Sequence, residues 1–174
     1  MRSILVILLA SASAFASGEL SGRRAPGFAL PDSTTKLHDP QDYRGKVLLV
    51  EFMQVDCLHC QKFSAVLEQT KAKYGDKVAI LSIVNPPSEA KGVAGFISKY
   101  KVTTPILFDC GQVAYAYIQP KGQQVAIPHL FLIDGEGMIR NDFAFSDATL
   151  PIFEGKALGP EIDKLLAPKP AGKK

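Results

Sequence analysis

Two cysteines separated by two residues, Cys57 and Cys60, are the residues of this chain best suited to carry out chemistry. His59 lies between them, and Glu51 interrupts the apolar segment "KVLLVEFM" (residues 46–53) that precedes them. A Cys-x-x-Cys pair can bind a metal ion, form a structural disulfide or exchange disulfides with another molecule. The elements that position the pair help to decide among these three uses.

Cys57 is expected at the start of a helix that follows a buried strand. Residues 46–53 are rich in β-branched and apolar side chains, which predicts a strand buried on both faces. Apolar residues then recur with a helical period to about Tyr74, and Gly75 is a typical residue at which a helix ends. The first turn of a helix has unpaired N–H groups and a partial positive charge, and both stabilise a thiolate. This context favours redox chemistry, in which Cys57 attacks and Cys60 resolves the mixed disulfide.

The two other uses of the pair fit the sequence less well. A structural zinc site commonly takes four ligands from two such pairs, and the sequence contains no second pair. The remaining cysteine and histidines are Cys110, His38, His59 and His129. A structural disulfide between Cys57 and Cys60 would close a short loop and add little stability.

His59 bears on the direction of the redox chemistry. An imidazolium at His59 would favour the thiolate over the disulfide, which would raise the reduction potential of the cysteine pair toward that of an oxidant or isomerase.

The rest of the sequence alternates strands and helices. Strands are expected at residues 28–30, 77–84, 105–108, 129–133 and 138–142. Helices are expected at 88–100, with Ser88 as the N-cap, at 112–118 and at 160–166. One further helical turn is expected within residues 38–46. Alternation of this kind predicts an α/β fold with parallel central strands. The late hairpin, which turns at residues 135–137, is expected to add antiparallel strands at the edge of the sheet.

Composition and charge exclude some classes of function. The chain has 174 residues and a formal net charge of +3, and it contains no arginine-rich stripe with interleaved aromatic residues. A nucleic-acid partner is therefore not expected. Three cysteines are too few for a disulfide-stabilised scaffold.

The N-terminus resembles a secretory leader. Arg2 precedes an apolar segment at residues 4–10, and Ala14 to Ala16 match the small-x-small pattern of a cleavage site. This predicts a signal peptide at 1–16; the alternative, an uncleaved anchor, would need roughly 20 apolar residues. We expect an exported, periplasmic or extracytoplasmic protein, with no membrane span once the leader is removed. One domain at 17–167 and a disordered tail at 168–174 would remain.

Three segments, in order, resemble the thioredoxin superfamily: "APGFALPD", "GKVLLVEFMQVDCLHC" and "IPHLFLIDGEGMIR". Within that superfamily the chain resembles the extracytoplasmic TlpA/ResA-like thiol–disulfide oxidoreductases and the related AhpC/TSA domains. The resemblance implies a three-layer α/β fold with a mixed central sheet and helices on both faces. It also implies disulfide exchange with protein thiol or disulfide substrates and with an upstream redox partner, without a cofactor.

The resemblance also implies roles for residues outside the Cys-x-x-Cys pair. The proline before the late strand is cis in this family and faces the cysteines, which makes Ile127–Pro128 the candidate cis bond; an ordinary trans turn is the alternative. The backbone of Ile127 would then pair with an extended substrate. His129 would face the site, where it could tune Cys57 or help to bind a soft metal. Glu51 occupies the position at which this family has a buried acid. Such an acid has a raised pKa and would exchange protons with Cys60 through a water. The alternative is a glutamate that is exposed to solvent at a strand edge.

The sequence departs from the family pattern around the motif. No tryptophan precedes Cys57 and no proline lies between the cysteines, which leaves the substrate preference open. Asp56 would oppose thiolate formation unless its carboxylate is turned to solvent. Gln54 stands where a peroxiredoxin has threonine, so peroxidase activity is not expected.

Two other functions are possible on the same fold. Sco-type copper chaperones bind Cu(I) through two thiolates and a histidine, for which Cys57, Cys60 and either His59 or His129 could serve. Those proteins have three residues between the cysteines, whereas this chain has two. The other possibility is a redox-inert interaction domain.

The third cysteine and the first histidine are not expected at the site. Cys110 is expected to be a buried core thiol, with a second redox step or a disulfide to a partner as the alternatives. His38 lies in a polar segment and is expected to be solvated.

Overall fold

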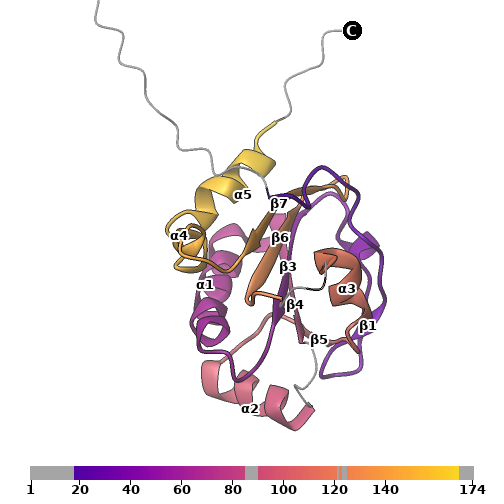
Figure 1. Cartoon of the computed structure of the whole chain (residues 1–174), viewed down its shortest axis with the longest axis vertical. Coiled ribbons are helices and arrows are strands. Elements are labelled where there is room, and N and C mark those ends of the chain that lie inside the picture. Colours follow the sequence, from indigo (N-terminus) through magenta and orange to yellow (C-terminus); the bar gives the residue numbers. More distant parts are fainter. Residues whose placement is uncertain (1–17, 85–89, 121, 123–124, 169–174) are drawn as a thin grey trace, which may run out of the picture.

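The computed structural model describes residues 18–84, 90–120, 122 and 125–168, which fold around one five-stranded sheet (Figure 1). The strands lie in the order β5-β4-β3-β6-β7. Their bounds are β3 Val47–Met53, β4 Val78–Val84, β5 Ile106–Phe108, β6 His129–Ile133 and β7 Ile139–Ala144. β3, β4 and β5 are parallel, whereas β6 pairs antiparallel with β3 and β7 pairs antiparallel with β6.

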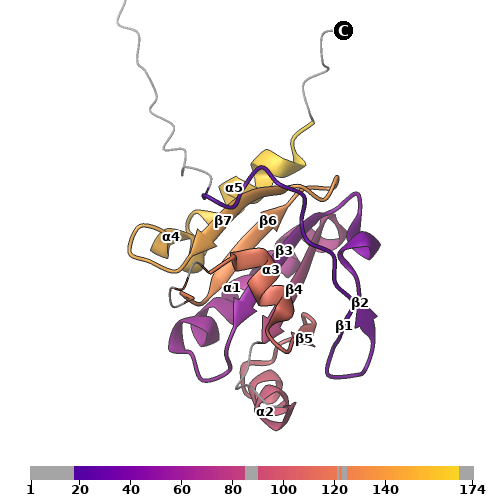
Figure 2. The same cartoon turned by 45° about the vertical axis from the view of Figure 1, so that its right-hand side comes forward.

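Helices cover both faces of this sheet, which confirms the predicted three-layer α/β architecture. The helices are α1 Leu58–Tyr74, α2 Ala90–Tyr100, α3 Gln112–Ile118, α4 Leu150–Phe153 and α5 Leu158–Leu166, with short 3-10 helices η1 Pro40–Tyr43 and η2 Gly75–Lys77. In Figure 1, α1, α4 and α5 lie on one side of the sheet, and α3 lies on the other with the N-terminal part of the chain. A two-stranded ribbon, β1 Leu30–Pro31 and β2 Leu37–His38, lies beside β5 (Figure 2), where Asp32 forms a bridge with Leu107.

Side chains of the central strand β3 alternate between the two layers of helices. Val47 and Leu49 pack in the core beneath α1 and α5, whereas Val50 and Phe52 pack in the core beneath α3. All seven residues of β3 are buried, as expected for a strand covered on both faces. Glu51 is the one charged residue in this strand, and the alternation directs it to the α1 side.

The sheet differs from the prediction in the position of the late hairpin. Of the two hairpin strands, only β7 lies at an edge of the sheet, because β6 lies between β3 and β7. All five residues of β6 are buried, which fits an interior position. Phe28 belongs to the core rather than to a strand, since β1 begins at Leu30. The four-residue helix α4 was not predicted, because its sequence "LPIF" is too short to show a period.

Some predicted features lie outside the described residues. These are the leader at 1–16, the cap at Ser88 and all but the first residue of the tail at 168–174.

The helix α1 ends as predicted at Gly75, whose φ of 55° lies in the left-handed region that favours glycine. Among the described residues, no helix is long and apolar enough to cross a membrane.

His38 is buried, which corrects the prediction that it is solvated. Its Nδ1 lies 2.6 Å from the Tyr43 hydroxyl and its Nε2 lies 2.9 Å from Asp32 Oδ2. The ribbon turns His38 inward, while the neighbouring Leu37 is 62% exposed. Burial acts to raise the pKa of Asp32, but hydrogen bonds from Thr34, His38 and nearby backbone groups prevail and lower it to about 2. The chain Asp32–His38–Tyr43 thus joins the ribbon to η1.

Candidate active site

Cys57 is the N-cap residue of α1, as the sequence predicts. Its backbone is extended, and its Sγ accepts a hydrogen bond of 3.2 Å from the Cys60 N–H. The sulfur therefore lies at the positive end of a 17-residue helix whose first turn contains no acidic residue. Cys57 is partly exposed, so a substrate can reach it. These features stabilise a thiolate and leave it free to react.

Cys60 lies close to Cys57 but in a different environment. The side chain is fully buried, in a cluster with Met53 and with Val93 of α2. Burial and the nearby Glu51 carboxylate raise the pKa of the Cys60 thiol well above its usual value. Cys60 thus stays protonated until a base removes its proton.

Glu51 is buried near Cys60 and accepts a hydrogen bond from Ser82. It is 1% exposed, and Ser82 on the neighbouring strand donates a hydrogen bond of 2.7 Å to Oε2. Oε1 has no hydrogen-bond partner among the described residues. Burial raises the pKa of Glu51 to about 7, although the Ser82 hydrogen bond acts to lower it. A carboxyl group with this pKa can both accept and donate a proton near neutral pH.

The segment before β6 packs against the buried cluster that contains Cys60. The peptide bond between Ile127 and Pro128 is cis. Ile127 packs against the same cluster as Cys60, as do the partly buried Cys57 and Val55. Residues 70 positions apart in the sequence are therefore brought into one site.

His129 lies across the sheet from the buried part of this site. It pairs with Phe52 on β3, and its ring stacks on Phe131 with centroids 4.7 Å apart, so its side chain points to the α3 side. Its Nε2 lies 3.7 Å from Asp142 Oδ2. The expectation that the His129 side chain faces the cysteines is therefore corrected. Side chains alternate along β6, and Leu130 takes the face that Glu51 shares.

His59 and Asp56 are both exposed. The exposure of Asp56 leaves its carboxylate hydrated, which weakens the repulsion of a Cys57 thiolate that the sequence suggested. The His59 ring lies against Phe145, with centroids 4.1 Å apart and planes inclined by 32°. Phe145 also donates its backbone N–H to the Pro128 carbonyl at 3.2 Å.

The sequence analysis did not identify Ser82 or Phe145 as site residues. Ser82 interrupts "KVAILSIV" as Glu51 interrupts "KVLLVEFM", and aligning the two segments as parallel neighbours would have paired the two polar residues. Extending the hairpin register by one residue beyond His129 and Ala144 would have placed Phe145 opposite Pro128.

Cys110 is exposed, which corrects the prediction of a buried thiol. It follows Asp109, whose carboxylate turns inward and accepts hydrogen bonds from the N–H groups of Val113 and Ala114. Asp109 is buried by this capping role, and the next residue in the turn points outward.

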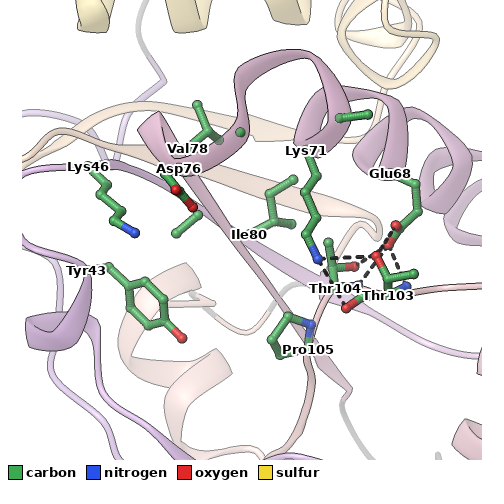
Figure 3. Close-up of a pocket in the computed structure, with 13 residues that line it drawn as sticks. Tyr43, Lys46, Glu68, Lys71, Asp76, Val78, Ile80, Thr103, Thr104 and Pro105 are labelled. Atoms are coloured by element: carbon green, nitrogen blue, oxygen red, sulfur yellow. Dashed lines mark hydrogen bonds between the residues drawn. The ribbon is translucent and has the colours of Figure 1, made fainter.

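A pocket of about 460 Å³ lies at the opposite end of α1 from the cysteines (Figure 3). Lys46 and Val78 line it at the amino ends of β3 and β4, whereas Cys57 follows the carboxyl end of β3. Its polar groups are partly engaged with one another, since Lys71 donates to Thr103 and Glu68 accepts from Thr103 and Thr104 (Figure 3). This pocket is separate from the cysteine site. Within the described ranges, no three histidine, cysteine or acidic residues are grouped so as to hold a metal ion.

Comparison with known proteins agrees with this geometry. The model of the AhpC/TSA family matches residues 21–142. The thioredoxin-like protein YneN of Bacillus subtilis is 26% identical over 126 residues, which are 71% of each chain. The thiol-disulfide oxidoreductase ResA of Geobacillus thermodenitrificans is 26% identical over 151 residues, 80% of this chain and 83% of ResA.

Solved structures show the same fold. A crystal structure from Chlorobium tepidum, assigned as the thiol:disulfide interchange protein DsbE, superimposes with a TM-score of 0.72 at 25% identity. The match covers 84% of this chain and 98% of that one. A family model that matches most of the chain, a thioredoxin-like fold and a Cys-x-x-Cys pair at a helix start agree with one another. This chain is a ResA-like member of the AhpC/TSA family, within the thioredoxin superfamily.

Proposed function

We propose that this protein is an exported thiol–disulfide oxidoreductase that exchanges disulfides with protein substrates through Cys57 and Cys60. One observation carries the proposal: a partly exposed Cys57 caps α1 next to a buried Cys60 that lies near Glu51. The relatives named thiol-disulfide oxidoreductases and thiol:disulfide interchange proteins support the reaction class. The apolar leader at 1–16 supports export.

In the reducing direction, the Cys57 thiolate attacks one sulfur of the substrate disulfide. The substrate S–S bond breaks, its second sulfur leaves as a thiolate that takes a proton from solvent, and a mixed disulfide forms at Cys57. Glu51 then accepts the proton of the Cys60 thiol, directly or through one water, and Cys60 attacks the Cys57 sulfur. The second substrate thiolate leaves. Two electrons pass to the substrate, and the protein ends as the Cys57–Cys60 disulfide.

The reverse sequence oxidises a substrate dithiol, and Glu51 then returns its proton to Cys60. The upstream redox partner that restores the starting state sets which direction operates. Ile127 would present its backbone to an extended substrate segment, since it packs against the cluster around Cys60.

The test is reduction of a model protein disulfide by the purified mature chain with a regenerating reductant. Cys57→Ser should abolish turnover, and Cys110→Ser, which removes the exposed third thiol, should retain it. Substantial turnover by Cys57→Ser would overturn the proposal.

The copper-binding alternative receives no support from the geometry. The His129 side chain lies across the sheet from Cys60, and the His59 ring lies against Phe145. A two-thiolate, one-histidine site requires an imidazole nitrogen beside both sulfurs, and no such grouping of three ligands is found among the described residues.

A further inference from the structure

The outer edge of β4 is only partly covered by β5. The two strands pair at residues 82–84 of β4, so residues 78–81 have no described strand beside them on that side. Val78, Ala79 and Ile80 instead line the pocket of about 460 Å³ at the end of α1 opposite the cysteines (Figure 3). A free strand edge offers backbone N–H and C=O groups to another extended chain. The pocket therefore contains backbone groups, as well as side chains, that a partner can bind.

Ile80 has the free backbone groups of this edge. Hydrogen-bonding groups alternate in direction along a strand, and the Ser82 N–H donates to the Pro105 carbonyl on the β5 side, so Ile80 points the same way. In the register that pairs Ser82 with Ile106, the Ile80 carbonyl would accept the N–H of residue 105, and the Ile80 N–H would donate to the carbonyl of Thr103. Residue 105 is a proline and has no N–H. The ladder between β4 and β5 therefore ends before it reaches the Ile80 carbonyl.

The segment before β5 is held away from Ile80 by side chains of α1. Glu68 accepts the N–H groups of Thr103 and Thr104, each at 2.9 Å, and Lys71 Nζ donates to the Thr103 carbonyl at 3.4 Å. Figure 3 shows both side chains reaching from α1 to these threonines. The backbone of residues 103–104 is thus engaged with α1, and in the described part of the chain it forms no hydrogen bond with Ile80. One donor and one acceptor on the edge of β4 are left for another strand.

The charges around this edge favour an acidic segment. Lys46 and Lys71 both line the pocket, and neither forms an ion pair with an acid within the described ranges. Of the two acids in the lining, Glu68 is engaged with the threonines, and Asp76 is exposed beyond the end of α1. Carboxylates on a bound segment would supply the two ammonium groups with charged hydrogen-bond partners.

Two other occupants of the edge match these charges less well. The chain's own C-terminal residues 167–174 contain three lysines and no acidic residue. A second copy of the chain, paired edge to edge, would bring its own Lys46 and Lys71 toward the same groups, and like charges in such positions are destabilising.

We propose that the free edge of β4 at Ile80 is a docking site for an extended, acidic segment of a partner protein, which adds to the sheet as a further strand. The backbone of the segment pairs with the N–H and C=O of Ile80, and its carboxylates bind Lys46 and Lys71. The site lies at the opposite end of α1 from Cys57, so docking there leaves the cysteines free to react.

The test is titration of the isotope-labelled mature protein with a capped hexapeptide of alternating valine and glutamate, followed by NMR at the Ile80 amide. Strand pairing should shift this resonance downfield and slow its hydrogen exchange by about tenfold or more. The same peptide with lysine in place of glutamate should bind about threefold more weakly or worse. The acidic peptide N-methylated at every residue cannot pair as a strand and should not bind. No change at Ile80 with the acidic peptide, or equal binding of its N-methylated form, would overturn the proposal.

Ala72→Phe is the blocking variant, because Ala72 is an exposed residue of α1 in the pocket lining and a phenyl ring there would fill the pocket. It should weaken binding of the acidic peptide by about tenfold or more, with amide resonances away from the pocket unchanged if the variant is folded. Ala65→Phe is the matched control, since Ala65 is an exposed alanine of α1 outside the lining, and it should bind like the unaltered protein. Lys46→Glu should reverse the preference between the acidic and basic peptides. Binding by Ala72→Phe equal to that by Ala65→Phe would contradict a site in this pocket.

Two measurements need no peptide. In the unaltered protein the Ile80 amide should exchange with solvent faster than those of Ala79 and Leu81, which face β3, and equal protection would show that the edge is not free. Sedimentation velocity should show no self-association that Ala72→Phe abolishes. A dimer that this variant abolishes would assign the edge to a second copy of the chain and overturn the proposal.

Discussion

Cys57 and Cys60 are three residues apart in the sequence, yet their sulfurs have different environments. Cys57 is partly exposed at the start of a helix, whereas Cys60 is buried near a carboxyl group. A helix N-terminus stabilises an accessible thiolate, and burial stabilises a protonated thiol. The two environments divide the work between an attacking and a resolving cysteine. Glu51 supplies the group that can remove the proton from the second.

Glu51→Gln should slow the resolution of the mixed disulfide by about 100-fold or more, because glutamine cannot accept the Cys60 proton. In the reducing direction the base is the ionised carboxylate, so the rate for the unaltered protein should rise as pH passes the Glu51 pKa of about 7. Stopped-flow measurement of the resolution step between pH 5 and 9 checks this. Ser82→Ala is the matched control, since it keeps the carboxyl, removes its hydrogen bond and should move the midpoint to higher pH. If Glu51→Gln showed the same rates and the same pH dependence as the unaltered protein, the role of Glu51 would be contradicted.

The same carboxyl should also make the free energy of unfolding depend on pH. The folded pKa of about 7 exceeds the ordinary value of 4.5, so the folded state binds the proton more tightly. The contribution of Glu51 to stability is therefore full below pH 4.5, falls as pH rises and is lost above about 7. Over this range it amounts to about 3 kcal/mol. Urea unfolding at pH 4 and pH 8 should show that Glu51→Gln gains stability relative to the unaltered protein only at the higher pH. An equal difference at both values would exclude a raised pKa.

At the scale of elements, strand alternation determines which predicted residues reach the site. Glu51 and Ser82 occupy matching positions on parallel strands and point to the α1 side. His129 occupies a position on β6 that points to the α3 side, although it adjoins Pro128 in sequence. The apolar runs of β3 and β4 and the start of α1 were predictable from composition and periodicity, because burial on both faces leaves a continuous apolar segment. The face of the sheet on which the His129 side chain lies could not be predicted in this way, because it depends on the register between β3 and β6.

The N-terminal ribbon shows the same limit. A polar segment with a histidine predicts an exposed turn, but His38 is buried because Asp32 and Tyr43 satisfy both of its ring nitrogens. Asp32 and Tyr43 are close to His38 in the sequence, but the turns that bring them to its ring form only in the folded chain. The exposure of Cys110 likewise follows from the inward capping role of its neighbour Asp109.

His38→Ala should destabilise the fold by about 2 kcal/mol, since it leaves the Oδ2 atom of the partly buried Asp32 and the Tyr43 hydroxyl without their His38 partner. Chemical unfolding at pH 7 measures the loss. Leu37→Ala is the control on the same strand, because Leu37 is largely exposed and its truncation should cost less than about 0.5 kcal/mol. Equal and small effects of both variants would show that the Asp32–His38–Tyr43 chain does not stabilise the ribbon.

At the scale of the whole molecule, the fold brings three distant segments to one end of the sheet. Cys57 follows the carboxyl end of β3, Ile127 precedes β6, and Phe145 follows β7. The two buried cores on either side of the sheet fix the strands that position these segments. The 460 Å³ pocket at the other end of α1 is separate from them. The family resemblance predicted the first two segments, whereas the position of Phe145 at this end follows from the register of the hairpin.

The division of roles between the two cysteines is tested most directly by trapping the mixed disulfide. The mature Cys60→Ser and Cys57→Ser variants, each also carrying Cys110→Ser, are mixed with a model protein disulfide, quenched with acid and analysed by mass spectrometry. We expect a stable mixed disulfide at Cys57 in the variant that lacks Cys60, and little or no adduct at Cys60 in the variant that lacks Cys57. An adduct that forms as fast at Cys60, or no adduct at Cys57, would contradict the account.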